Sequence, residues 1–183
     1  MEAVWVFLPV LGALVPHAPV LRWDLAPALN RPLDFGTRFR GRRVFGDNKS
    51  WRGAIVMFTG TLVATLVLSR WPWFRDRLPD DVRDAPPAVY GALLGAGVVL
   101  GELPNSFFKR RLGIAPGARR KSPAGVAIAV LDQGDFVLGA WVLLLPIWVM
   151  PPLGALLAFV VVAAVHAVIN VIGYAVGART SPI

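Results

Sequence analysis

The stretch GALLGAGVVLGELPNSFFKRR, from Gly91 to Arg111, begins as an apolar membrane-type segment and ends in three consecutive cations. Glycines recur in it at four-residue spacing, as the pairs Gly91/Gly95 and Gly97/Gly101. This spacing lets helix backbones approach one another closely. The pattern lacks the third glycine of a dinucleotide-binding fingerprint, so we predict a tightly packed transmembrane helix and no nucleotide fold of that type.

The rest of the chain is similarly apolar. Of its 183 residues, 56% are hydrophobic and 16% are charged, with a mean hydropathy of +0.60. A soluble domain needs more polar surface than this, so the composition indicates an integral membrane protein with one domain over residues 1–183. The absence of cysteine excludes disulfides, thiolate metal sites and a cysteine nucleophile. No cation precedes Arg22, which favours a retained first span over a cleaved secretory signal.

Five apolar segments qualify as helices that cross the hydrocarbon, which takes about 20 residues of helix. They cover approximately residues 3–21, 51–68, 86–103, 136–150 and 153–176. The predicted fold is therefore an all-α integral membrane protein with five transmembrane helices. Prolines inside these segments are tolerable, because neighbouring groups in a bundle can satisfy the freed carbonyls.

The connections between these segments differ strongly in charge. Arg22 to Arg52 holds eight Lys/Arg and three Asp, and Asn105 to Leu131 holds six Lys/Arg and no acid. Arg70 to Ala85, by contrast, holds four arginines and four aspartates. The positive-inside rule predicts that loops 22–50 and 105–131 are cytoplasmic, with the N-terminus outside and the C-terminus inside.

Carboxylates stand at the ends of the third and fourth spans. Asp132 and Asp135 are three residues apart and would share a helix face, where they repel unless a cation lies between them. Mg²⁺ commonly binds one or two carboxylates together with substrate oxygens. The alternative is a helix cap, for which one aspartate suffices. Glu102 is either a third metal ligand or the partner of an arginine such as Arg52.

The first basic connection also carries groups that suit a nucleotide. The sequence GDNKS, Gly46–Ser50, resembles a phosphate loop but is not a Walker motif, because Lys49 follows Asn48 and not glycine. Cations and backbone N–H groups would hold phosphates, while carboxylates would hold a metal. The alternative is that the basic loops only set topology and contact anionic lipid.

Four separated motifs resemble the CDP-archaeol synthase family, and more broadly the CTP-dependent cytidylyltransferases that include CDP-diacylglycerol synthase. They are RPLDFGTRFRGRRVFGDNKSWRG, GELPNSFFKRRLGI, VLDQGDFVLG and INVIGYAVGARTSPI, in the family's order and spacing from about Arg31 to the end. The resemblance implies a five-span fold with a cytoplasmic catalytic cavity. It also implies that CTP and a phosphorylated lipid, archaeol-phosphate-like or phosphatidate-like, give a CDP-lipid and pyrophosphate.

The resemblance also implies roles for individual residues. Catalytic roles fall on Asp132, Asp135, Lys109 and Glu102, and the three acids among them would bind Mg²⁺. Substrate-binding roles fall on Asp47, Asn48, Lys49, Arg52, Asn105, Ser106 and Arg110. The implied partners are CTP, a phosphorylated lipid and the bilayer of the cell membrane, without nucleic acid. Gln133 suits the archaeol branch, while the oligomeric state and the lipid tail stay open.

Two other functional classes remain alternatives. A non-catalytic membrane protein could bind anionic lipid or nucleotide through the same basic loops, but it has no need for Asp132 and Asp135 together. A small transporter would place charges near mid-membrane, whereas these carboxylates lie at span ends. A Ser-His-Asp triad is not expected, because His17 and His166 both lie within spans.

Overall fold

A computed structural model of the chain describes residues 2–115, 128, 131–132 and 134–175. Its elements in chain order are α1 (Glu2–Val6), η1 (Leu8–Ala13), α2 (Leu14–Arg22), η2 (Pro27–Leu29), β1 (Arg38–Phe39), β2 (Arg42–Arg43), α3 (Trp51–Leu68), α4 (Pro72–Arg75), α5 (Asp80–Asp84), α6 (Pro87–Arg111), α8 (Asp135–Leu144) and α9 (Pro152–Ala175). Gln133, most of the predicted second loop and the last part of the C-terminal motif lie outside the described residues.

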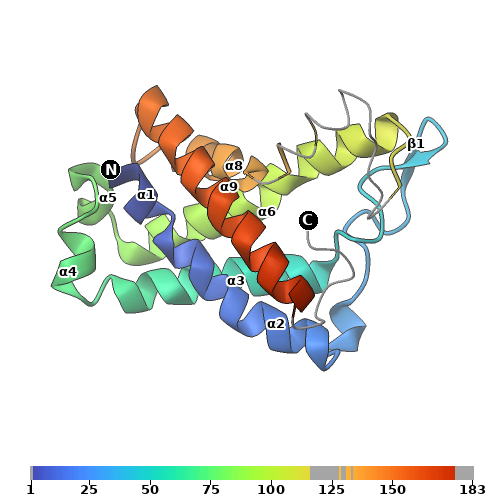
Figure 1. Ribbon diagram of the computed structural model, residues 1–183, viewed down its shortest axis with the longest axis horizontal. Helices are drawn as coiled ribbons and strands as arrows, with labels where there is room; N and C mark the ends of the chain where they lie inside the picture. Colours follow the sequence, from blue (N-terminus) through green and yellow to red (C-terminus); the bar gives the residue numbers. More distant parts are fainter. Residues whose placement is uncertain (1, 116–127, 129–130, 133, 176–183) are drawn as a thin grey trace.

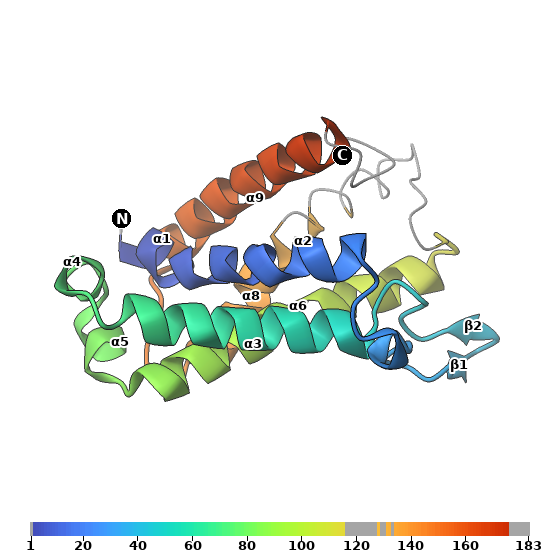
Figure 2. The same cartoon turned by 90° about the horizontal axis from the view of Figure 1, so that it is seen from below.

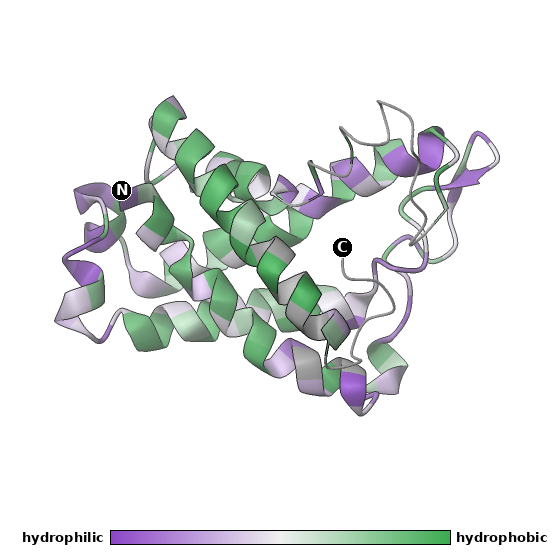
Figure 3. Cartoon of the chain, in the orientation of Figure 1, coloured by the Kyte–Doolittle hydropathy of each residue, from purple (hydrophilic) through white to green (hydrophobic). Residues whose placement is uncertain are grey.

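The long helices form one bundle (Figure 1), in which α6 packs against both α3 and α8, and α3 also packs against η1. Figure 2 shows the β1–β2 hairpin at one end of the bundle and the short helices α4 and α5 at the other. Hydrophobic residues run along the helices and hydrophilic residues gather at these two ends (Figure 3). We call the end that carries the hairpin and the C-terminus of α6 the basic end. An apolar middle between two polar ends is the pattern of a protein that lies in a bilayer.

The helical membrane class predicted from composition agrees with this structure, but the helix boundaries differ. In the described part of the chain, α3 and α6 are each long and apolar enough to cross a membrane. The first predicted span, 3–21, is divided into α1, η1 and α2, and Pro9 lies in the first turn of η1. The predicted fourth span, 136–150, ends as a helix at Leu144, after which the chain turns around Pro146. The count of five spans stays a prediction.

Helix α6 continues eight residues past the predicted end of the third span at residue 103. Pro87 at its first position suits a helix start, because proline has no backbone N–H and an N–H at that position would have no helical partner. Its other end closes in a Schellman motif: Gly113 has a φ of +74°, and Ile114 N–H donates to Lys109 O at 2.9 Å. The second basic connection therefore begins on a helix, not in a loop.

The first basic connection contains a β-hairpin, which the prediction of an all-α fold did not include. Strands β1 and β2 pair antiparallel, with Arg38 opposite Arg43. Arg40 and Gly41 between them both have positive φ, 50° and 77°, as in a two-residue type I′ turn. The sequence signal for this turn is weak, because an arginine occupies the position where asparagine or aspartate is preferred.

Buried Asp34 holds this connection together. Its carboxylate accepts hydrogen bonds from the N–H groups of Gly36 (3.1 Å), Phe45 (2.9 Å) and Gly46 (3.0 Å), and it pairs with Arg43 at 2.5 Å. Burial opposes ionisation of Asp34, but these donors outweigh it and hold its pKa well below the usual range. One carboxylate thus joins three separated points of the connection.

The contact between α6 and α8 is made backbone to backbone. A Cβ atom at Gly97 would lie 2.4 Å from Ala140 Cα, and one at Gly101 would lie 2.7 Å from Asp135 O. A Cβ at Gly139 would lie 2.3 Å from Gly101 Cα. The predicted tight packing is confirmed: the second glycine pair faces α8, and the first pair faces α3.

Because backbone atoms cannot move aside as side chains do, we expect Gly139→Ala to push α6 and α8 apart. Overpacking of this kind typically costs about 1–3 kcal/mol of folding free energy, so the thermal midpoint of the detergent-purified protein should fall. Gly53→Ala is the matched control, since its Cβ would only touch Ser50 Oγ at 3.5 Å. Equal midpoints for the two variants would contradict the close packing.

Asp34 should give the fold a distinctive pH dependence. Its lowered pKa means that the ionised carboxylate stabilises the folded state above the unfolded value of about 3.9, and that this stabilisation is lost as pH falls toward the folded pKa. We expect Asp34→Asn to lower the thermal midpoint at pH 7, with a difference from wild type that shrinks below about pH 4. Asp47→Asn, which removes an exposed partner of the same Arg43, should change little. A difference for Asp34→Asn that stays constant with pH would refute this assignment.

Candidate active site

Asn105 on α6 joins the two aspartates that the sequence analysis singled out. Its Nδ2 donates to Asp132 Oδ1 at 2.9 Å and to Asp135 Oδ2 at 3.0 Å. Asp135 is the first residue of α8 and follows the N-cap residue Gly134, which has no side chain. The same amide joins both aspartates, an arrangement that a capping role alone does not require. Asn105 lies one turn beyond Gly101, so the close helix contact brings its amide to both carboxylates.

Two lysines accompany these carboxylates. Lys109, one turn further along α6, forms an ion pair with Asp132, and Lys49 from the segment before α3 forms one with Glu102. Burial lowers the pKa of the Lys49 ammonium, but the carboxylates of Glu102, Asp135 and Asp132 outweigh it and hold that pKa above its usual value. In the part of the chain that the structure describes, three carboxyl groups thus face two ammonium groups.

The donor set fits a divalent cation that also binds a substrate. Among the described residues, no three His, Cys, Asp or Glu side chains gather into a metal site of their own. Asp132 and Asp135, however, share one amide nitrogen and keep other oxygens available as hard donors. Mg²⁺ usually binds one or two carboxylates plus phosphate oxygens, not a complete protein cage. Glu102 is less available as a ligand, because its carboxylate is bound to Lys49.

Lys49 reaches this site because its segment is fixed at both ends. Asp34 accepts from Gly46 N–H, and Leu33 N–H donates to Lys49 O at 2.7 Å. Ser50 then caps α3, with its Oγ accepting from the N–H of Gly53 at 3.2 Å. The first basic connection and α6, far apart in sequence, therefore supply cations to one place.

Arg52, which was predicted to bind substrate, instead makes contacts within the protein. Its buried guanidinium pairs with Asp24 and donates to Leu25 O at 3.1 Å, which ties the start of α3 to the chain after α2. Glu102 does form a salt bridge, but its partner is Lys49 and not an arginine such as Arg52.

Arg110 also makes contacts within the fold. It is buried, and its Nε donates to Phe45 O at 3.0 Å. Asp47 is exposed and pairs with Arg43, Asn48 is exposed, and Ser106 is buried in α6. The structure thus brings together six of the predicted residues: Lys49, Glu102, Asn105, Lys109, Asp132 and Asp135.

Asp34 was not singled out from sequence, although it lies in the motif RPLDFG. An aspartate two residues before glycine is a recognisable turn signal, and its side chain does accept from Gly36 N–H. That signal would have indicated a local turn only. The hydrogen bonds to Phe45 and Gly46 depend on the hairpin that brings them back, so they needed the structure.

Comparisons with known proteins extend over nearly the whole chain. The family model described as CarS-like, CDP-archaeol synthase, matches residues 3–182. A CDP-archaeol synthase of Halobacterium salinarum is 36% identical, over 98% of this chain and 94% of the relative. One from Pyrococcus furiosus is 32% identical, over 100% and 97%.

A solved structure, described as an intramembrane enzyme for archaeal membrane lipids biosynthesis, is also similar. It is 29% identical with a TM-score of 0.66, and the match covers 93% of each chain. The family-model match over residues 3–182 includes the segments that carry the site. The chain therefore belongs to the CDP-archaeol synthase family.

Proposed function

We propose that this protein is a membrane enzyme that transfers a cytidylyl group from CTP to a phosphorylated lipid. The observation that carries the proposal is the pairing of Asp132 and Asp135 through Asn105, beside Lys49 and Lys109. Membership of the CDP-archaeol synthase family supports the reaction class. The name of the relatives supports an archaeol-type lipid phosphate as the acceptor.

The reaction needs positioning and charge neutralisation more than a protein nucleophile. An oxygen of the lipid phosphate attacks the α-phosphorus of CTP and forms the new P–O bond. The bond from the α-phosphorus to the oxygen that bridges it to the β-phosphorus breaks, and pyrophosphate leaves with that electron pair. The attacking phosphate is already ionised at neutral pH, so the protein does not have to supply a general base.

Each of the gathered residues has a role in this scheme. Asp132 and Asp135 would hold Mg²⁺, with Glu102 as a third ligand if Lys49 releases it. When bound, Mg²⁺ neutralises charge on phosphate oxygens. Asn105 keeps the two aspartates side by side. Lys109 and Lys49 offer positive charge to the phosphates, which stabilises the departing pyrophosphate.

The remaining predicted residues divide into two groups. Asp47, Asn48 and Ser106 stay candidates for substrate contact. Arg52 and Arg110 act as positioning residues, because each holds a segment that borders the site. The excess of cations in both basic connections supports a cytoplasmic location for this end, where CTP is available.

Loss of either aspartate should abolish the reaction without preventing membrane insertion. We expect Asp132→Asn and Asp135→Asn to reduce formation of CDP-lipid from labelled CTP by about 100-fold or more, since each removes charge that the transition state depends on. Asp81→Asn, an exposed aspartate at the opposite end of the bundle, is the matched control. Near wild-type rates in both site variants, with normal insertion, would remove the proposed metal role.

The acceptor is best identified with a panel of phosphorylated lipids. We expect turnover of labelled CTP with an archaeol-type ether phosphate to exceed that with an ester phosphatidate, but by no more than about 200-fold, because apolar pockets discriminate weakly between hydrocarbons. Kinetics of CDP-lipid formation measure this directly. Turnover of the ester alone would refute the archaeol-type acceptor. CTP–Mg²⁺ that raises the thermal midpoint without any product would instead favour the non-catalytic nucleotide-binding alternative.

A further inference from the structure

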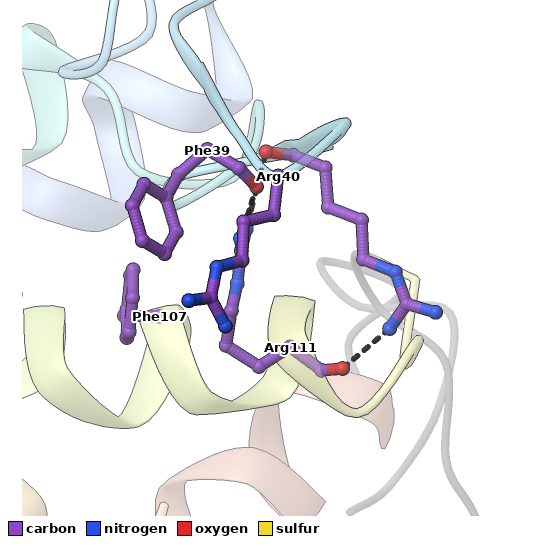
Figure 4. Close-up of a pocket in the computed structure, with 5 residues that line it drawn as sticks. Phe39, Arg40, Phe107 and Arg111 are labelled. Atoms are coloured by element: carbon purple, nitrogen blue, oxygen red, sulfur yellow. Dashed lines mark hydrogen bonds between the residues drawn. The ribbon is translucent and has the colours of Figure 1, made fainter.

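A second anion-seeking surface lies at the basic end, between the hairpin and α6 (Figure 4). It is a cleft of about 460 Å³ lined by Phe39, Arg40, Arg42, Phe107 and Arg111. We call it the hairpin cleft. The residues of the described part that line it are all arginine or phenylalanine, so it combines positive charge with aromatic rings and, within that part, contains no carboxylate.

The hairpin cleft is separate from the proposed active site. Phe107 and Arg111 are four residues apart and share one face of α6, and Asn105 and Lys109 share another. The two faces are offset by two residues, which is about 200° around a helix of 3.6 residues per turn. A nucleotide held by the aspartates therefore lies on the far side of α6 from the cleft.

The positive charge around the cleft is not balanced by nearby acids. Asp34 and Asp47, the acids between residues 31 and 50, both pair with Arg43, which does not line the cleft. The guanidinium of Arg42 donates to the carbonyls of residues 110 and 111, and that of Arg111 donates to carbonyls of the hairpin. Carbonyl groups satisfy donors but leave the formal charge in place.

Arg40 is the most available of these cations. In the described part of the chain its guanidinium has no ion pair or hydrogen bond, and it lies 5.5 Å from the centre of the Phe39 ring. A guanidinium next to an open cleft can bind a phosphate through two parallel hydrogen bonds. Arg40 therefore has both the chemistry and the freedom to bind an anion.

The aromatic part of the cleft suits the boundary between headgroups and acyl chains. The rings of Phe39 and Phe107 are 6.1 Å apart, and the Arg111 guanidinium lies 5.4 Å and 4.9 Å from their centres. Phe39 is 48% exposed, and the neighbouring Phe108 is 59% exposed. Arginine beside exposed phenylalanine is the composition of surfaces that lie in the membrane interface.

The length of α6 brings the cleft to this depth. Its 25 residues span about 37 Å at about 1.5 Å per residue, whereas the hydrocarbon core is about 30 Å thick. The last turns, with Phe107 and Arg111, therefore extend to the level of the headgroups. A cleft of this chemistry at this depth faces lipid phosphates.

We infer that the hairpin cleft binds the phosphate of an acidic lipid of the surrounding bilayer, as a site distinct from that of the reacting lipid. Arg40 and Arg42 pair with the phosphate, and Phe39 contacts the apolar part of the lipid next to it. The site holds the tip of the hairpin at the membrane surface.

The test uses the full chain purified in a neutral detergent, with bound lipid counted by native mass spectrometry during titration with phosphatidylglycerol. Wild type should retain this acidic lipid, and Arg40→Asn should weaken retention about fivefold, the contribution of one basic residue near an acidic surface. Arg40→Lys should keep it within about twofold, because the charge remains. Asparagine tolerates the positive φ of Arg40, so the turn is preserved in the test variant.

Four comparisons decide the outcome. Arg70→Asn, which removes an exposed arginine after α3 at the opposite end, should bind like wild type. Equal retention by Arg40→Asn and wild type, or equal retention of zwitterionic phosphatidylcholine, would overturn the proposal. Displacement of the lipid by millimolar inorganic phosphate would assign the cleft to a soluble anion instead. The readout does not depend on catalysis, so it tests the lipid site independently of the cytidylyltransferase proposal.

Discussion

The close approach of α6 and α8 at Gly97, Gly101 and Gly139 is the constraint on which the proposed site depends. Only residues without a Cβ allow these backbones to touch. Asn105 lies one turn beyond this contact and Asp135 begins α8, so the approach brings amide and carboxylate within 3.0 Å. A separation larger by the width of one methyl group would break that hydrogen bond. The glycine pattern therefore serves chemistry as well as packing.

Charge at the basic end is organised by pairing. The ion pair of Asp34 with Arg43 shapes the first connection. The same connection places Lys49 next to Glu102, and Lys109 pairs with Asp132. Such pairs near a bilayer avoid the cost of an isolated charge. In the reaction proposed above, Mg²⁺ would bind the carboxylates of these pairs and the triphosphate would pair with their lysines. The arginines of the hairpin cleft lack carboxylate partners in the described part of the chain, which is why we propose that they bind the phosphate of a lipid.

Much of the architecture was predictable. The segment 51–68 coincides with α3, and 153–176 differs from α9 by one residue at each end. Helix α6 extends past the third predicted span, because the helix continues after its hydropathy falls and carries Asn105 and Lys109 on its polar last turns. Helix α8 ends before the fourth predicted span does, because apolar residues continue after the helix has ended. Hydropathy measures where a residue can be buried, and it does not report where helical hydrogen bonding stops.

The sequence by itself determined the membrane class, the approximate helices and the supply of acids and cations, since hydropathy, glycine spacing and charge are properties of local segments. It also indicated that Asp132 and Asp135 act together, because three residues of spacing suffice for that. Only the tertiary structure decided which charge meets which: Lys49 with Glu102, Arg52 with Asp24 and Arg110 with a carbonyl of the first connection. These partners are remote in sequence, and a charged side chain binds whatever group the packing of helices brings within a few ångströms.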